Sequence, residues 1–172
     1  MFWTENGWLH KAGMDLSNKT RLLYTGSGSL ALDVPNGRIY WTEFSAIKSA
    51  NLEGTDTITF RRCSSLWECA HNGIGLNDGI IYFGGSTGPG GASGVVQSID
   101  TREESYSTQF VMYTPSTILD LTIFGSADTG ASLRRNNCEG QQCSHLCVLA
   151  NQSFKCLCPE NMLLGPDQRT CL

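Results

Sequence analysis

The sequence predicts an all-β chain, and two observations carry that prediction. Residues 2–5 read Phe-Trp-Thr-Glu and residues 40–43 read Tyr-Trp-Thr-Glu, 38 positions later. Each copy also breaks into short apolar runs between turn residues, rich in β-branched and aromatic side chains and without a helical period. A repeat of about 40 residues indicates a propeller, a solenoid or a helical array, and four antiparallel strands per repeat favour the blade of a β-propeller.

The second copy is the best defined and predicts a complete blade. Its expected strands are residues 30–33, 38–42, 47–52 and 57–60. Asn36-Gly37 separates the first two strands, and this dipeptide is a strong hairpin signal because Gly tolerates the positive φ of tight turns. By the same alignment, residues 1–26 supply the last three strands of a preceding blade.

A third, eroded copy follows. Its expected strands are residues 72–77, 80–83, 96–99 and 109–113. Gly84 and Gly85 replace the Thr and the acid of the other copies, and the glycine-rich stretch 84–94 is interpreted as a mobile loop. A last apolar segment, residues 118–124, has the composition of a first strand but no blade after it.

These motifs resemble a known family. Leu-Ala-Leu-Asp, Tyr-Trp-Thr-Glu and Ile-x-x-Ala-x-Leu-x-Gly are similar to the YWTD, or class B, repeat of the low-density lipoprotein receptor family. The resemblance covers essentially the whole chain and is specific for residues 1–62. It implies about three blades of a six-bladed YWTD-type propeller, followed by an EGF-like domain. Both good copies carry Glu where the family usually has Asp.

The cysteines fit the second part of that expectation. Six of the eight follow the spacing C-x4-C-x3-C-x8-C-x1-C-x12-C, which is similar to that of an EGF-like domain. Six cysteines alone allow many connectivities. The resemblance implies the pairs Cys138–Cys147, Cys143–Cys156 and Cys158–Cys171, each bridge contributing about 2–4 kcal/mol to so small a module.

Metal binding is the competing interpretation of this region, and the residues argue against it. A zinc site at Cys156-Leu-Cys158 lacks the usual gap and a second pair at ligand spacing. A calcium site of the EGF type would have Arg134-Arg135 close by, and Leu149 where an oxygen ligand is needed. We therefore expect no metal and no other cofactor.

The remaining features favour an oxidising, secretory-route compartment. Cys63 and Cys69 bracket the connection between two blades and are expected to bridge each other, with two buried thiols as the alternative. Asn18-Lys-Thr and Asn151-Gln-Ser are candidate glycosylation sequons.

Composition limits the function classes. The chain is 40% hydrophobic and 16% charged with a net charge of −4, so no nucleic-acid partner is expected. No apolar run reaches 18 residues, so neither a membrane span, direct membrane insertion nor a signal peptide is expected. Met1 lies in a strand motif, so we expect a piece of a larger protein, with a partial propeller at 1–125, a linker at 126–135 and an EGF-like domain at 136–172.

Catalysis is not expected. Gly84–Gly88 matches the G-x-S-x-G pattern around Ser86, but that pattern requires a helix to start at once, and the following Gly-Pro-Gly-Gly forbids one. His10, His71 and His145 are far apart in sequence and are interpreted as structural or solvated.

The repeat-motif residues are interpreted as packing residues. Trp3 and Trp41 recur at the repeat period, which favours packing between blades over a binding hot spot. The Thr and the Glu of the motif are expected to accept hydrogen bonds from neighbouring backbone or side-chain donors within the sheets. The full predicted set is Trp3, Thr4, Glu5, Tyr40, Trp41, Thr42 and Glu43.

The sequence therefore predicts a non-enzymatic extracellular binding module. The resemblance implies an endocytic or signalling receptor as its parent, with an extracellular protein or lipoprotein ligand and the remaining blades and modules of that parent as partners. The alternative is a secreted matrix or growth-factor-precursor protein of nidogen or EGF-precursor type. A piece of about three blades leaves strand edges and side walls open, so we expect it to be poorly packed in isolation.

Overall fold

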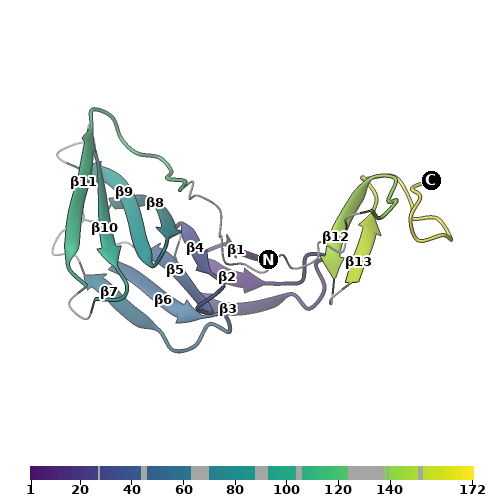
Figure 1. Cartoon of the computed structure of the whole chain (residues 1–172), viewed down its shortest axis with the longest axis horizontal. Coiled ribbons are helices and arrows are strands. Elements are labelled where there is room, and N and C mark those ends of the chain that lie inside the picture. Colours follow the sequence, from purple (N-terminus) through teal and green to yellow (C-terminus); the bar gives the residue numbers. More distant parts are fainter. Residues whose placement is uncertain are drawn as a thin grey trace. The chain divides into compact units, whose positions relative to one another are not determined.

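The chain is all-β in its computed structural model, which describes residues 1–26, 28–43, 46–62, 70–87, 93–103, 106–123, 138, 140–150 and 153–172. Within these ranges thirteen strands form four sheets, and there is no helix (Figure 1). The chain divides into two compact units, one of Trp3–His10 with Arg21–Gly125 and one of Met1–Phe2 and Lys11–Thr20 with Ser126–Leu172. The predicted fold class, a partial propeller with a disulfide-rich module, is confirmed.

The first blade is a sheet of three strands in the order β1-β2-β3. Asn6 and Gly7 connect β1 to β2 with φ angles of 52° and 78°, the positive values that a tight two-residue hairpin turn needs. The strand bounds are β1 Phe2–Glu5, β2 Trp8–Lys11 and β3 Thr20–Tyr24.

The second blade is an antiparallel meander in the order β4-β5-β6-β7. The Asp33 carboxylate holds its first turn by accepting hydrogen bonds from the backbone N–H and Nδ2 of Asn36, at 3.2 and 2.9 Å, and Gly37 supplies a φ of 65°. The bounds are β4 Leu30–Asp33, β5 Arg38–Glu43, β6 Ala46–Asn51 and β7 Ile58–Arg62.

The third blade repeats this meander with longer strands, in the order β11-β10-β9-β8. The interpretation of residues 84–94 as a loop is wrong at both ends, because β9 continues to Thr87 and β10 begins at Ser93. Backbone pairing of Val96 with Gly84 and of Ser93 with Thr87 makes residues 84–87 and 93–94 strand despite their glycines, and residues 88–92 lie outside the described residues. The bounds are β8 Ala70–Asn77, β9 Ile80–Thr87, β10 Ser93–Asp100 and β11 Thr108–Thr114.

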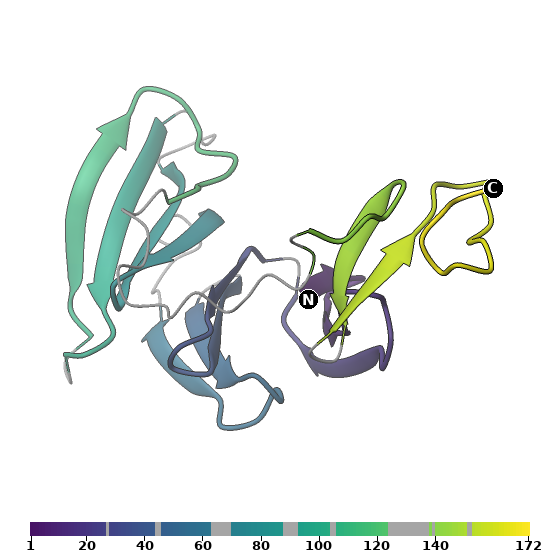
Figure 2. The ribbon, with the colours of Figure 1, turned by 45° about the vertical axis from the view of Figure 1, so that its right-hand side comes forward.

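The second and third blades pack face to face (Figure 2). Burial of these apolar faces is the main term that holds the two sheets together. Tyr40 contacts Phe60 within the second blade with ring centroids 5.6 Å apart, and Phe60 meets Tyr106 edge-on at 4.5 Å. The buried cluster consists of Ala31, Tyr40, Ile47 and Phe60 from the second blade and Ile74, Ile81, Phe83 and Ile99 from the third.

The segment after β11 is not a strand. Residues 117–123 have no ladder partner, although residues 118–124 have the composition of a first strand; residue 124 lies outside the described residues. Asn72 Nδ2 donates a hydrogen bond to the backbone oxygen of Ile118 at 2.6 Å, which places the segment beside β8.

The C-terminal module is a small hairpin braced by disulfides. Strands β12 (Leu146–Ala150) and β13 (Ser153–Leu157) pair antiparallel, with Cys147 opposite Cys156. An isolated bridge between Leu164 and Cys171 closes the last loop. The proposed linker at 126–135 lies outside the described residues, so its prediction stays untested.

Candidate functional site

The repeat motif of the second blade lies inside the protein. Trp41 is 1% exposed and Tyr40 is 2% exposed, on opposite faces of β5. The Thr42 hydroxyl accepts a hydrogen bond from the backbone N–H of Ser29 at 3.2 Å, which ties β5 to the start of β4. Glu43 forms an ion pair with Lys48 of the next strand. Thr42 and Glu43 thus contact neighbouring strands, and Tyr40 and Trp41 are buried.

The same motif in the first blade is more exposed. Trp3 is half-buried and stacks on the ring of His10, with centroids 5.4 Å apart and planes 18° from parallel. The Glu5 carboxylate lies 3.8 Å from His10 Nε2. Thr4 is half-buried as well. His10 is thus held by an aromatic ring and a carboxylate of its own sheet, which is a structural arrangement.

An open groove of about 720 Å³ lies along the first strands of the second and third blades. Its walls are mostly backbone and aliphatic side chains, with hydroxyl groups and one carboxylate as polar groups. A concave surface of this kind can receive a ligand. Its lining residues are Trp3, Thr4, Gly28, Ser29, Leu30, Ala31, Leu32, Ile74, Gly75, Leu76, Asp120, Leu121, Thr122 and Ile123.

The geometry around Ser86 does not match a hydrolase. Ser86 lies inside β9, with its backbone opposite Gly94 of β10 and Ala70 of β8, so it does not stand on a strand-to-helix turn. His145 Nδ1 lies 3.0 Å from the hydroxyl of Ser144 in the C-terminal module. Among the described residues, no group of three or more His, Cys, Asp or Glu side chains could hold a metal ion.

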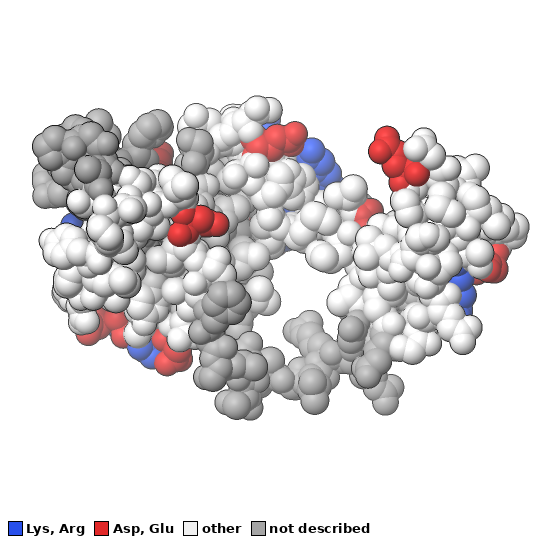
Figure 3. Space-filling view, turned by 90° about the horizontal axis from the view of Figure 1, so that it is seen from above, with Lys and Arg blue, Asp and Glu red and all other residues white. Residues whose placement is uncertain are grey.

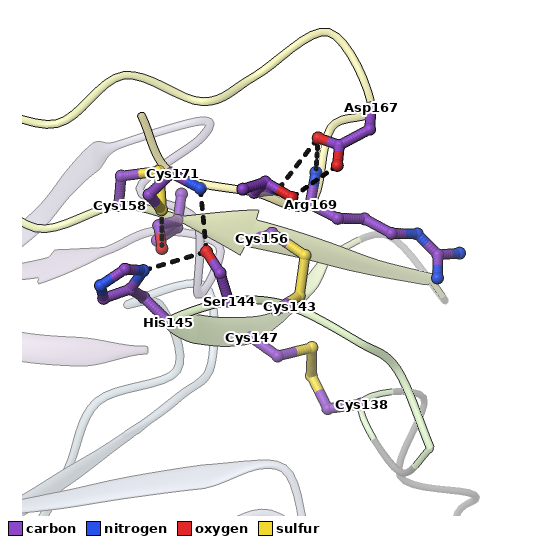
Figure 4. Close-up of a disulfide and its surroundings, with 12 residues drawn as sticks. Cys138, Cys143, Ser144, His145, Cys147, Cys156, Cys158, Asp167, Arg169 and Cys171 are labelled. Atoms are coloured by element: carbon purple, nitrogen blue, oxygen red, sulfur yellow. Dashed lines mark hydrogen bonds between the residues drawn. A yellow bond between two sulfur atoms is a disulfide. The ribbon is translucent and has the colours of Figure 1, made fainter.

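Disulfides dominate the C-terminal module (Figure 4). Cys138 is bonded to Cys147, Cys143 to Cys156 and Cys158 to Cys171. The Ser144 hydroxyl accepts a hydrogen bond from the Cys171 backbone N–H at 2.8 Å and so joins the start of the module to its end.

The last loop of this module is organised by one carboxylate. Asp167 accepts hydrogen bonds from the backbone N–H groups of Arg169 and Thr170, both at 3.0 Å, and from the Thr170 hydroxyl at 2.6 Å. Hydrogen bonds from Thr170, ahead of that from Arg169, lower the pKa of Asp167 from 3.8 to about 2, because they stabilise the charged form.

Charged side chains elsewhere form local pairs. Figure 3 shows one face of the molecule, on which acidic and basic residues are few and scattered. Arg102 hydrogen-bonds Asp100 at 2.7 and 2.8 Å and lowers the pKa of that carboxyl to about 2. Arg38 pairs with Asp56 at 2.8 Å and also donates to the Ser49 hydroxyl, which fixes the turn before β7.

Three of the predicted site residues lie outside the described residues. Cys63, Cys69 and Asn151 are among the residues that the structure does not describe, so their proposed roles stay predictions. Asn18 is exposed and has a left-handed backbone with φ of 53°, in a turn whose following Thr20 is also exposed. Glycosylation of Asn18 stays a prediction.

One group of residues with a clear structural role was missed by sequence reasoning. Gly73, Gly75, Gly84 and Gly94 share one face of the third blade, and the segment after β11 packs directly on them. The signal was present as glycines two residues apart in an otherwise strand-like run, which indicates close approach of another backbone.

Comparison with known proteins finds a similarity to a receptor. No protein-family model matches the chain. The chain is 26% identical over 185 aligned residues to the vitellogenin receptor Yl of Drosophila melanogaster, with 100% of this chain aligned. It spans 9% of the length of that receptor. The similarity runs through both the blades and the disulfide module, so the chain is receptor-like along its whole length.

No segment of the described residues is a helix long and apolar enough to cross a bilayer. The receptor similarity and the three disulfides are consistent with an extracellular or secretory location.

Proposed function

We propose that this chain is a non-enzymatic, ligand-binding piece of the extracellular part of a receptor of the low-density lipoprotein receptor type. The observation that carries the proposal is the alignment of the entire chain with a vitellogenin receptor. Blades followed by a module with three disulfides support it, because this is the order that the YWTD and EGF resemblance implies. The parent would be an endocytic or signalling receptor.

The binding surface that we propose is the groove along β4 and β8. It is open, has a mixed polar and apolar wall and is lined by residues of β1, β4 and β8 together with residues 120–123. An extracellular protein or lipoprotein could insert a loop or an extended segment there. Asp120 and Thr122 are exposed polar residues of its lining and are the positions chosen for substitution.

The test is a binding measurement on the secreted ectodomain of the parent protein, with insect vitellogenin and human low-density lipoprotein as probes. Asp120→Arg with Thr122→Arg should lower the affinity at least tenfold at unchanged secretion yield. Glu160→Arg, at an exposed site of the C-terminal module, is the matched control and should bind normally. Equal affinity of all three ectodomains would exclude the groove, and no binding by the unchanged ectodomain would argue against both probes as ligands.

The alternative parent is a secreted matrix or growth-factor-precursor protein. Proteins of that kind carry the same pair of modules, so the resemblance makes this the second candidate after the receptor. A membrane-spanning segment and a cytoplasmic sorting motif encoded in the same gene would support the receptor, and their absence from the full coding sequence would support the secreted protein.

The catalytic alternative is tested by chemical labelling. A fluorophosphonate probe should leave the purified protein unlabelled, because Ser86 lies within a strand and not on a nucleophile turn. Labelling that disappears in a Ser86→Ala variant would overturn the non-enzymatic assignment.

A further inference from the structure

Three side chains of the first blade, Trp8, Arg21 and Tyr24, form a contact group that is here called the rim cluster. The guanidinium carbon of Arg21 lies 4.4 Å from the centroid of the Trp8 ring. The Tyr24 ring meets Trp8 edge-on, with centroids 5.4 Å apart. A Cβ added at Gly7 would lie 2.7 Å from Tyr24 Cε2, so the Tyr24 ring rests on the turn between β1 and β2. Trp8 is half-buried, whereas Arg21 and Tyr24 are exposed.

The repeat does not account for the rim cluster. At the 38-residue offset that aligns the first two blades, its three positions correspond to Ala46, Thr59 and Arg62. The tryptophan of the Trp-Thr-Glu motif recurs at that offset, whereas Trp8 has an alanine as its equivalent. A packing requirement common to the blades therefore does not explain why these side chains are present.

The third blade contains a counterpart of Tyr24. In the second blade, Arg62 of the outer strand pairs with Ala46, and in the third blade Tyr113 pairs with Val95. Ala46 and Val95 each lie three residues before the serine that pairs with the tyrosine of the second strand. Since Tyr24 aligns with Arg62, Tyr113 occupies the place of Tyr24 in the third blade.

This counterpart stays exposed although another blade packs on its face. Val95, the partner of Tyr113, lies on the same face of β10 as Ile99, which belongs to the buried cluster between the second and third blades. Tyr113 is nevertheless 71% exposed, and Phe110, whose ring centroid is 4.6 Å from that of Tyr113, is 54% exposed. The outer strand thus extends beyond the adjoining sheet. A blade packed on the first blade would leave the position of Tyr24 accessible in the same way.

The rim cluster presents a cation to a partner. Among the described residues no carboxylate pairs with Arg21. Stacking on Trp8 uses a face of the planar guanidinium and leaves its in-plane N–H donors available. A carboxylate matches this fork, because it can accept two parallel hydrogen bonds from it. Trp, Tyr and Arg are also the residue types most enriched in the hot spots of protein interfaces.

We propose that the rim cluster is a docking site for an acidic segment of a partner protein. One Asp or Glu of that segment accepts hydrogen bonds from Arg21, and an apolar neighbour covers the Tyr24 ring. The cluster supplies one cation, which suits one carboxylate, whereas sulfated glycans and anionic lipid surfaces are bound by groups of several Lys and Arg. The rim cluster shares no residue with the groove along β4 and β8 and does not depend on the proposed receptor function.

Accessibility is tested first, on the longest secreted product of the gene, so that every blade is in place. Hydroxyl-radical footprinting should oxidise Tyr24 at a rate within threefold of that of Tyr113. It should oxidise Tyr40, which is 2% exposed, at least tenfold more slowly. A rate for Tyr24 as low as that for Tyr40 would overturn the proposal, because another blade would then cover the rim cluster.

Binding is tested with phage-displayed random dodecapeptides selected on the same secreted protein. One class of peptides should lose at least tenfold in affinity on the Arg21→Gln variant, and its members should share an Asp or Glu. Arg62→Gln is the matched control, since Arg62 is also an exposed arginine on an outer strand, and it should bind this class normally. If no peptide class depends on Arg21, or if the dependent class has no acidic residue, the proposal is wrong.

A double-mutant cycle then tests the contact itself. Replacing the acidic residue of such a peptide by its amide should weaken binding to the unchanged protein at least tenfold and binding to Arg21→Gln less than twofold. Arg21→Lys keeps the charge without the planar fork and should still lose at least threefold. Equal losses on both proteins, or full affinity of Arg21→Lys, would overturn the proposal. Arg21-dependent binding of a heparin oligosaccharide without an acidic peptide class would also overturn it, in favour of a sulfated glycan.

Discussion

At the residue scale, the second and third blades each carry a pair of aromatic side chains in their second strand. Trp41 fills the interior on one face of β5, and Tyr40 fills it on the other. The equivalent residues of the third blade are Phe83, also 1% exposed, and Tyr82. The pattern of an aromatic pair in the second strand thus survives where the Thr and the acid of the motif have been replaced by glycine.

Trp41→Ala should lower the free energy of unfolding by about 3–5 kcal/mol, because the substitution removes a fully buried ring and leaves a cavity. Urea denaturation of the secreted protein measures this. Leu32→Ala is the control, since Leu32 is 41% exposed and should cost about 1 kcal/mol or less. Normal yield and stability of the Trp41→Ala protein would contradict the packing role of Trp41 and favour a role in binding.

The pH dependence of the last loop follows from Asp167. Its folded pKa of about 2 lies below the ordinary value of 3.8, so folding favours the charged carboxylate. The resulting stabilisation is present above pH about 4 and is lost as the pH falls through about 2. In an NMR titration, Thr170→Val should raise this pKa toward 3.8, whereas Thr170→Ser keeps the hydroxyl donor and should leave the pKa near 2. An unchanged pKa in Thr170→Val would show that the hydroxyl is not the cause.

At the element scale, turn chemistry decided where strands begin and end. Asn6-Gly7 and Asp78-Gly79 both have positive φ at both positions, and each joins two strands with no spare residue. Composition predicts a loop for the glycine-rich stretch after Phe83. Residues 84–87 are strand because they pair with β10, and Gly84 also lies close to Ile118; neither partner is local to that stretch.

The next prediction concerns which cysteines are joined by disulfides. Peptide mapping of secreted protein without reduction should show Cys138–Cys147, Cys143–Cys156 and Cys158–Cys171, and a Cys63–Cys69 bridge with no free thiol. Free Cys63 and Cys69 would remove the bridge proposed for the blade connection and leave the module as it is. Any other pairing among the last six cysteines would contradict the EGF assignment.

At the scale of the whole molecule, the two blade interfaces are unequal. The second and third blades share a continuous apolar cluster, whereas the first blade has three strands and leaves Tyr24 59% exposed. On the third blade, Leu121 and Ile123 lie against Gly73 and Gly75, whereas Val111 is 45% exposed. Apolar burial therefore stabilises the middle of the blade array more than its flanks.

Residues 1–172 produced alone should consequently unfold in more than one step. Hydrogen exchange should protect the amides of β5, β6 and β9 most and those of β1–β3 least, while residues 140–172 stay ordered through their disulfides. When the chain is extended upstream with further blades of its proposed parent, the unfolding steps should merge into one cooperative transition. A single sharp thermal transition with uniform protection in residues 1–172 would show that the open flanks cost little.

The sequence by itself determined the all-β class, the repeat and the approximate position of each strand in the blades. Hydrophobic alternation and Asn-Gly or Asp-Gly turns act over a few residues, so they can be read from the chain alone. The spacing of the last six cysteines predicts an EGF-like module, and the resemblance to that module implies how the cysteines pair. Only the tertiary structure decided that Tyr40 and Trp41 face different partners, and that residues 117–123 lie on glycines instead of forming a strand. A strand needs an edge to pair with, and which edge or face is free is a property of the packed blades that no local pattern encodes.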